Sequence, residues 1–64
     1  MQVPSEKKLP EDRRRALFLA LVRAQDAGTD VAASRKQASW RFGVSEDEVR
    51  AIEREGLDAG WPPL

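Results

Sequence analysis

Apolar residues recur at helical spacing between Pro10 and Gly28. Four of the large ones fall on one face of a helix, and they are Leu17, Phe18, Leu21 and Val22. Proline suits the first position of a helix, and the acidic residues Glu11 and Asp12 after it interact favourably with the helix dipole. The pattern therefore predicts a first helix that begins at Pro10 and is ended by Gly28.

A second apolar stripe is thinner. Val31, Ala38 and Phe42 are spaced seven and four residues apart, so they share one face of a helix. Thr29 or Asp30 supplies a side-chain oxygen that can cap the start of this helix. We expect a second helix that runs to about Phe42.

The next residues carry the signals for a helix end, a tight turn and a new helix start. Gly43 can take the left-handed conformation that ends a helix, and Ser45 can accept a hydrogen bond from the backbone N–H of Glu48. The Glu48 carboxylate can reach back to the Ser45 N–H as a capping box, while Val44 and Val49 form a hydrophobic staple. A third helix is therefore expected to begin at residue 46.

This third helix is expected to run from residue 46 to residue 55. Gly56 is expected to end it, with Leu57 placed for the hydrophobic contact of a Schellman motif. The segment after it cannot continue as a helix because it contains Gly60, Pro62 and Pro63, and we expect this Trp-Pro-Pro tail to pack back over the bundle. The predicted core is Leu17, Phe18, Leu21, Val22, Val31, Phe42, Val49 and Ile52.

The sequence around the turn resembles the turn and recognition helix in the promoter-reading C-terminal domain of the primary sigma factors of bacterial RNA polymerase. The resemblance covers about residues 37–57, and its matching positions are Phe42, Gly43, Val44, Ser45, Val49, Arg50, Ile52 and Glu53. It implies that the second and third helices form a helix-turn-helix in a module of transcription type. The chain departs from the sigma pattern where DNA would lie, because Glu46 and Glu48 replace basic residues and Ala51 replaces a polar base reader.

The chain length and composition limit the fold and the chemistry. Sixty-four residues make one small all-α domain, and we expect a flexible segment over 1–8 followed by a single trihelical domain over 9–64. A domain near this size buries only about 60% of the surface of its unfolded chain. Without cysteine or histidine there is no disulfide, no usual zinc site and no imidazole base. We therefore expect no enzyme activity, no metal, no cofactor and no small-molecule substrate.

The charges also limit the partners. Eleven basic and eleven acidic residues cancel, so any DNA contact must come from a local patch. The candidate DNA-binding residues are Arg35, Lys36, Arg41, Arg50 and Arg54. The third helix also carries five carboxylates, so we expect DNA binding to be weak. The chain lacks the apolar run of a signal peptide or a membrane span, which favours a cytoplasmic location. Its cysteine-free, Arg- and Ala-rich composition fits a bacterial protein.

A protein partner is the alternative to DNA. Trp40 projects opposite the apolar stripe of the second helix, so it is either the floor on which Trp61 and Pro62 pack or an exposed anchor for a partner. We favour the floor, because a small core needs the aromatic area. The candidate protein-docking residues are Leu19, Trp40, Trp61 and Leu64. The sequence thus predicts a helix-turn-helix module with weak DNA binding or docking to the transcription machinery; the alternative is an adaptor or oligomerisation domain that reuses the scaffold without DNA.

Overall fold

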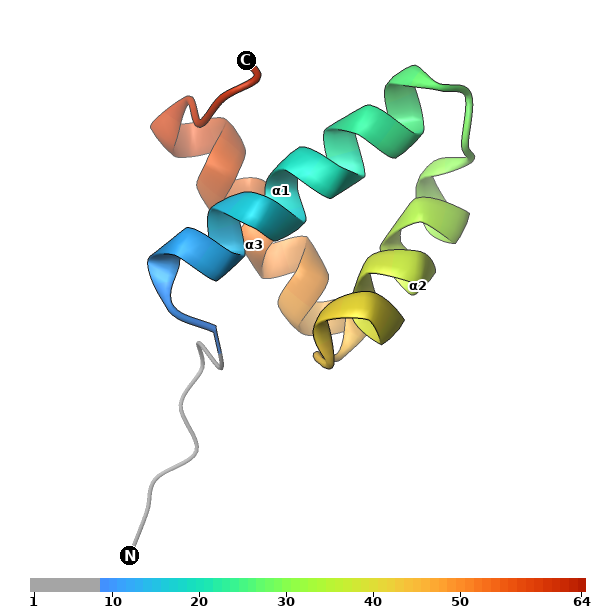
Figure 1. Ribbon diagram of the computed structural model, residues 1–64, viewed down its shortest axis with the longest axis horizontal. Helices are drawn as coiled ribbons and strands as arrows, with labels where there is room; N and C mark the ends of the chain where they lie inside the picture. The colour runs from blue at the N-terminus through green and yellow to red at the C-terminus, as the bar shows by residue number, and fades with distance from the viewer. Residues whose placement is uncertain (1–8) are drawn as a thin grey trace, which may run out of the picture.

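The computed structural model describes residues 9–64, so the expectation of a flexible segment over 1–8 lies outside the described residues. It contains three helices, α1 (Glu11–Asp26), α2 (Val31–Phe42) and α3 (Glu46–Ala59), and no strand within residues 9–64. Each helix packs against the other two, and α1 crosses in front of α3 in Figure 1. The prediction of an all-α, three-helix fold is confirmed. Over residues 9–64, none of the helices has the length and apolar character needed to cross a membrane.

The first two helices begin and end close to the predicted positions. Pro10 is the residue before α1 rather than its first residue, and Gly28, with φ of 100°, lies just beyond its end. The Asp30 side chain caps α2 by accepting hydrogen bonds from the backbone N–H groups of Ala32 and Ala33 at 3.1 and 3.4 Å. Asp30, rather than Thr29, is thus the cap of the second helix.

The connection between α2 and α3 is short and held by several hydrogen bonds. Gly43 has φ of 69°, and its N–H and that of Val44 both donate to the Ser39 carbonyl, at 2.9 and 3.1 Å. The Ser39 hydroxyl donates back to the Val44 carbonyl at 2.6 Å. Ser45 then caps α3 by accepting a hydrogen bond from the Glu48 N–H at 3.1 Å. The predicted turn and cap are confirmed.

Val44 and Val49 are both buried, as expected for a hydrophobic staple. The reciprocal hydrogen bond expected in a capping box runs from the Ser45 N–H to the Glu48 carboxylate. Oε2 of this carboxylate is buried and has no hydrogen-bond partner within residues 9–64. This oxygen therefore does not bond back to the Ser45 N–H.

Ser45→Ala is expected to lower the free energy of unfolding by about 1 kcal/mol, because it removes the acceptor for the first turn of α3. Urea denaturation followed by circular dichroism measures this change. Ser45→Asp is the matched control, since aspartate caps as well as serine and should retain the native stability. Equal stability of the Ala variant and the native chain would contradict the assigned cap.

The end of α3 differs from the prediction. The helix continues through Gly56 and Leu57 to Ala59, one turn beyond the expected end at Glu55. The Schellman motif is formed instead at Gly60, which has φ of 67°, and the N–H of Trp61 donates to the Gly56 carbonyl at 3.0 Å. Leu57, expected to make the hydrophobic contact of this motif, is exposed.

Gly56 has a packing role instead of a terminating one. It is buried inside α3, and a Cβ atom built on it would lie 2.4 Å from Cδ1 of Phe18. The missing side chain lets the ring of Phe18 lie directly on the α3 backbone. This close approach explains a glycine in the interior of a helix.

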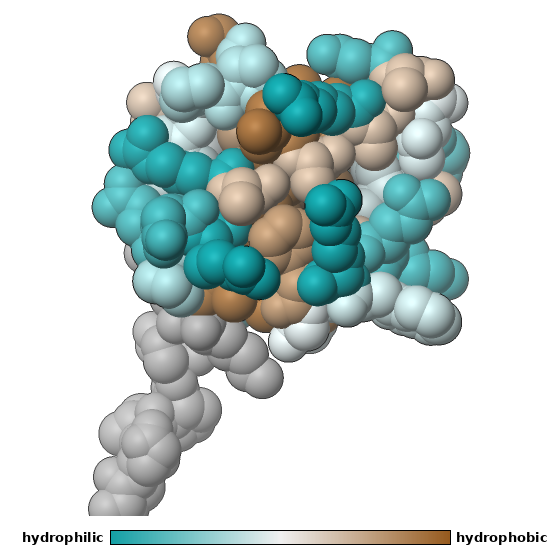
Figure 2. Space-filling view, in the orientation of Figure 1, coloured by the Kyte–Doolittle hydropathy of each residue, from teal (hydrophilic) through white to brown (hydrophobic). Residues whose placement is uncertain are grey.

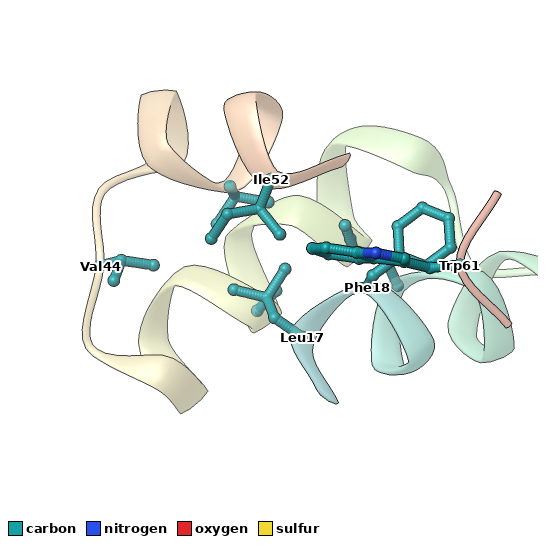
Figure 3. Close-up of a cluster of buried hydrophobic side chains, with 8 residues drawn as sticks. Leu17, Phe18, Val44, Ile52 and Trp61 are labelled. Atoms are coloured by element: carbon teal, nitrogen blue, oxygen red, sulfur yellow. The ribbon is translucent and has the colours of Figure 1, made fainter. Parts of the chain in front are cut away.

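The core lies where the three helices meet, and Figure 3 shows Val44 at one end of it and Phe18 with Trp61 at the other. The buried apolar residues are Leu17, Phe18, Leu21, Ala38, Val44, Val49, Ile52 and Trp61. Five of the eight predicted core residues are among them, whereas Val22 and Phe42 are only partly buried. Val31 is 45% exposed, so its assignment to the core is wrong.

Val31 is exposed because it is the first residue of α2, at the edge of the packed region. The inward position one turn later belongs to Ser34, which is buried. Its hydroxyl donates to the Val31 carbonyl at 2.7 Å and accepts from the Gln25 side-chain amide at 3.1 Å. The buried polar group is thus satisfied, and it joins α2 to α1.

The two tryptophans lie in opposite environments. Trp61 is 5% exposed and packs edge-on against Phe18, with 6.0 Å between the ring centroids and 81° between the planes. The Arg15 guanidinium lies 5.1 Å from the centroid of the Trp61 ring. Trp40 is 84% exposed, so the expectation that it forms the floor under Trp61 and Pro62 is wrong.

Two ion pairs tie α3 to its neighbours. Arg14 on α1 binds Glu55 in a bidentate pair, with Nε–Oε1 and Nη2–Oε2 distances of 2.9 and 3.0 Å. The hydrogen bond to Glu55 raises the pKa of Arg14, so this side chain stays charged. Arg35 on α2 binds Glu53 at 3.0 Å. These pairs fix how α3 is oriented relative to α1 and α2.

Candidate functional site

The outward face of α3 is the exposed side of this helix. Val49, Ile52 and Gly56 are buried on the opposite side of this helix. The exposed residues of the outward face are Glu46, Asp47, Arg50, Ala51, Arg54, Leu57 and Asp58. Arg50 and Arg54 lie one helical turn apart on it.

Three of the five candidate DNA-binding residues lie together beside this face. Arg35, Arg50 and Arg54 line one open hollow of about 480 Å³ between α2 and α3. Ala51 and Leu57 also line it, together with Glu53, the carboxylate that pairs with Arg35. The structure therefore brings three of the five candidates together on one surface.

The arginines of this surface differ in how strongly they are already paired. Arg35 binds Glu53 and is half-buried, so part of its charge is neutralised inside the protein. The Arg50 guanidinium donates to Asp47, three residues earlier on the same helix. Arg54 forms no ion pair within residues 9–64, so it is the cation of this surface most available to a partner.

Lys36 and Arg41 lie elsewhere. Lys36 shares a hollow with Trp40 on the outer side of α2, and Arg41 lies on the side that faces α1. The guanidinium of Arg41 is 5.9 Å from the centroid of the Phe42 ring. The structure therefore separates these two candidates from the other three.

The outward face of α3 is close to electrically balanced. It carries two arginines and the three carboxylates Glu46, Asp47 and Asp58, so its formal charge is −1. Glu48 and Glu53 are half-buried, and Glu53 pairs with Arg35 at the edge of this face. An anionic partner thus meets local attraction at Arg54 and repulsion at the start of the helix.

The candidate docking residues do not form one patch. Trp61 is buried in the core, which removes it from any surface, and Leu64 is exposed in the tail beyond α3. Leu19 is half-buried in a groove between α1 and α2. Trp40 stands on the outer side of α2, in an open apolar hollow of about 270 Å³ with Ala33, Lys36 and Gln37.

The groove that contains Leu19 was not predicted from the sequence. It has a volume of about 480 Å³, and Arg23 and Arg41 line it together with Phe42. The available signal was the spacing of Leu19 and Arg23, which places both on one side of α1 one turn apart. Its pairing with Arg41 depends on how α1 packs on α2 and has no local sequence signal.

Within residues 9–64, no group of three or more acidic, histidine or cysteine side chains is arranged to hold a metal ion. Comparison of the chain with family models, with curated proteins and with solved structures finds no match.

Proposed function

We propose that the protein is a non-enzymatic helix-turn-helix module of transcription type, in which α2 and α3 form the motif and the outward face of α3 binds duplex DNA weakly. One observation carries the proposal. The turn between α2 and α3 is held by the Ser39 hydrogen bonds to Gly43 and Val44 and by the Ser45 cap. The exposed face of the α3 that follows this turn holds Arg50 and Arg54 beside Arg35.

The arrangement suits a known mode of DNA recognition. In a helix-turn-helix the second helix enters the major groove, and the first helix crosses the phosphate backbone. Arg50 and Arg54 on α3 would then approach base edges or groove phosphates, and Arg35 on α2 would approach a backbone phosphate. Ala51 leaves room between the two α3 arginines for close approach to the bases, and its methyl group can contact thymine.

Weak affinity follows from the charges. This surface offers three arginines to phosphates, and Arg35 and Arg50 must share their charge with Glu53 and Asp47. Sequence-independent affinity at physiological salt is then expected at a Kd of about 10⁻⁴ to 10⁻⁶ M. With three phosphate contacts, the logarithm of the binding constant should fall with the logarithm of salt at a slope of about −2.7.

Glu46→Arg combined with Asp47→Asn is expected to tighten binding to DNA. The first change replaces a repulsive group at the start of α3 with an attractive one, and the second frees the Arg50 guanidinium. We expect binding at least tenfold tighter at low salt and a steeper salt slope, by about one unit for each added phosphate contact. Fluorescence anisotropy with a labelled random-sequence duplex measures both quantities.

The matched control is Asp12→Asn combined with Asp26→Arg, which makes the same change in formal charge on α1. The proposal predicts a much smaller gain in affinity for this control, because both residues lie away from the outward face of α3. Duplex binding that is undetectable at low salt for both the native chain and the α3 variant would refute the proposal.

A protein-interaction domain without DNA binding is the second candidate, and the exposure of Trp40 favours it. A tryptophan that is 84% exposed is a typical anchor of a protein interface. Under this alternative the α3 variant would gain no affinity for DNA, and Trp40→Ala would weaken partner binding without affecting the fold.

A further inference from the structure

A second surface of the molecule combines unpaired arginines with an apolar floor. The groove of about 480 Å³ between α1 and the last turn of α2 is lined by Leu19, Ala20, Arg23, Ala24, Arg41 and Phe42. The small alanines keep its floor low, and Leu19 and Phe42 are both half-buried there. Figure 2, which views the molecule from the side of α1, shows an apolar strip bordered by strongly hydrophilic side chains.

The two arginines that line this groove, Arg23 and Arg41, form no ion pair within residues 9–64, as is also true of Arg54 on α3. Arg14, Arg15, Arg35 and Arg50 each bind a carboxylate. Arg13, Arg23 and Arg41 bind none within residues 9–64, and the guanidiniums of Arg13 and Arg41 lie 5.3 and 5.9 Å from the centroid of the Phe42 ring. Stacking on the ring holds these two groups beside the groove with their N–H donors free.

The apolar surface extends beyond the groove. Arg41 also lines a smaller hollow with Ser34, Ala38 and Gln37, and Gln37 in turn lines the hollow of Trp40. The groove, the small hollow and the exposed indole are therefore adjacent. They lie on the sides of α2 away from Arg35, which faces α3, so this surface is separate from the proposed DNA-binding face.

We propose that the groove between α1 and α2 binds an acidic amphipathic segment of a partner protein. Apolar side chains of the segment would lie on Leu19 and Phe42, and its carboxylates would pair with Arg23 and Arg41 at the two sides. Charge complementarity selects this occupant, because the rim offers only cations and their N–H donors are unoccupied. Phosphates of a nucleic acid would satisfy the rim but leave the apolar floor uncovered, so a peptide fits the groove better.

The inference goes beyond the proposed DNA binding and does not depend on it. A synthetic peptide of about 16 residues, with leucines at helical spacing on one face and glutamates elsewhere, serves as the probe. Its binding to the full chain is measured by fluorescence anisotropy at low salt. A peptide with the same leucines and glutamine in place of glutamate is the matched control ligand, and it is expected to bind at least tenfold more weakly.

The decisive variant is Arg23→Glu combined with Arg41→Glu, which reverses the rim charge without removing a buried group. We expect it to lower the affinity for the acidic peptide at least tenfold. Arg50→Glu combined with Arg54→Glu makes the same charge change on α3 and should leave peptide affinity within about twofold of native. Circular dichroism tests whether each variant keeps its helices.

Three results would overturn the proposal. The first is no binding of the acidic peptide to the native chain at low salt. The second is an equal loss of peptide affinity in the groove and α3 variants, which would indicate a general charge effect. The third is loss of duplex DNA binding in the groove variant but not in the α3 variant, which would assign the groove to nucleic acid. Loss of DNA binding confined to the α3 variant, together with loss of peptide binding confined to the groove variant, supports both proposals.

Discussion

Replacing Trp61 with alanine is expected to lower the free energy of unfolding by about 3 to 5 kcal/mol. Its indole is buried and packs edge-on against Phe18, so the change removes a large part of one end of the core. A folded chain of 64 residues is typically stable by roughly 3 to 10 kcal/mol, so the loss removes a large part of the total. Thermal and urea unfolding followed by circular dichroism should show a partly or wholly unfolded variant.

Trp40→Ala is the matched control for this prediction. It removes the same side chain from an exposed position on α2, so its effect on stability is expected within about 0.5 kcal/mol. Equal destabilisation by the two alanine variants would contradict the opposite environments of the two tryptophans.

The second large effect is expected for Gly56→Ala. In an exposed helix interior this change usually stabilises by about 1 kcal/mol, because alanine has the higher helix propensity. Here the new Cβ would lie 2.4 to 2.7 Å from three atoms of the Phe18 ring, so the ring or the helix must move. We expect a net loss of about 1 to 3 kcal/mol, measured by urea denaturation.

The source of this loss is tested in a Phe18→Leu background. Without the ring the added methyl group meets less resistance, so Gly56→Ala should cost clearly less there than in the native chain. A Gly56→Ala variant that is more stable than the native chain would show that α3 and Phe18 are not in close contact.

The parts of the fold that sequence predicts well are those with local signals. The Gly43 turn and the Ser45 cap depend on neighbouring residues, and both are formed as predicted. The end of α3 is different, because Gly56 and Gly60 both qualify as terminators from local sequence. Gly56 remains helical because the ring of Phe18, on another helix, packs where a side chain of residue 56 would lie. That contact is long-range, so the local sequence does not reveal it.

The candidate surfaces also combine features set by neighbouring residues with features set by helix packing. Arg50 and Arg54 share one helix face because they are four residues apart, which is a local feature of the sequence, whereas the position of Arg35 beside them depends on how α2 packs on α3. The expectation that the C-terminal tail covers Trp40 is wrong, because it assumes that every aromatic side chain is needed in the core. Phe18 and Trp61 fill one end of the core between them, and the buried residues of α2 are the small Ser34 and Ala38.

The central claim, that the outward face of α3 binds duplex DNA, is tested most directly by NMR. Backbone amide shifts of the labelled chain would be followed while a random-sequence duplex is added at low salt. The account predicts fast-exchange shifts concentrated at Arg50, Ala51 and Arg54, with smaller shifts near Arg35, and their disappearance as salt is raised. An unchanged spectrum at low salt, or shifts confined to the groove between α1 and α2, would contradict it.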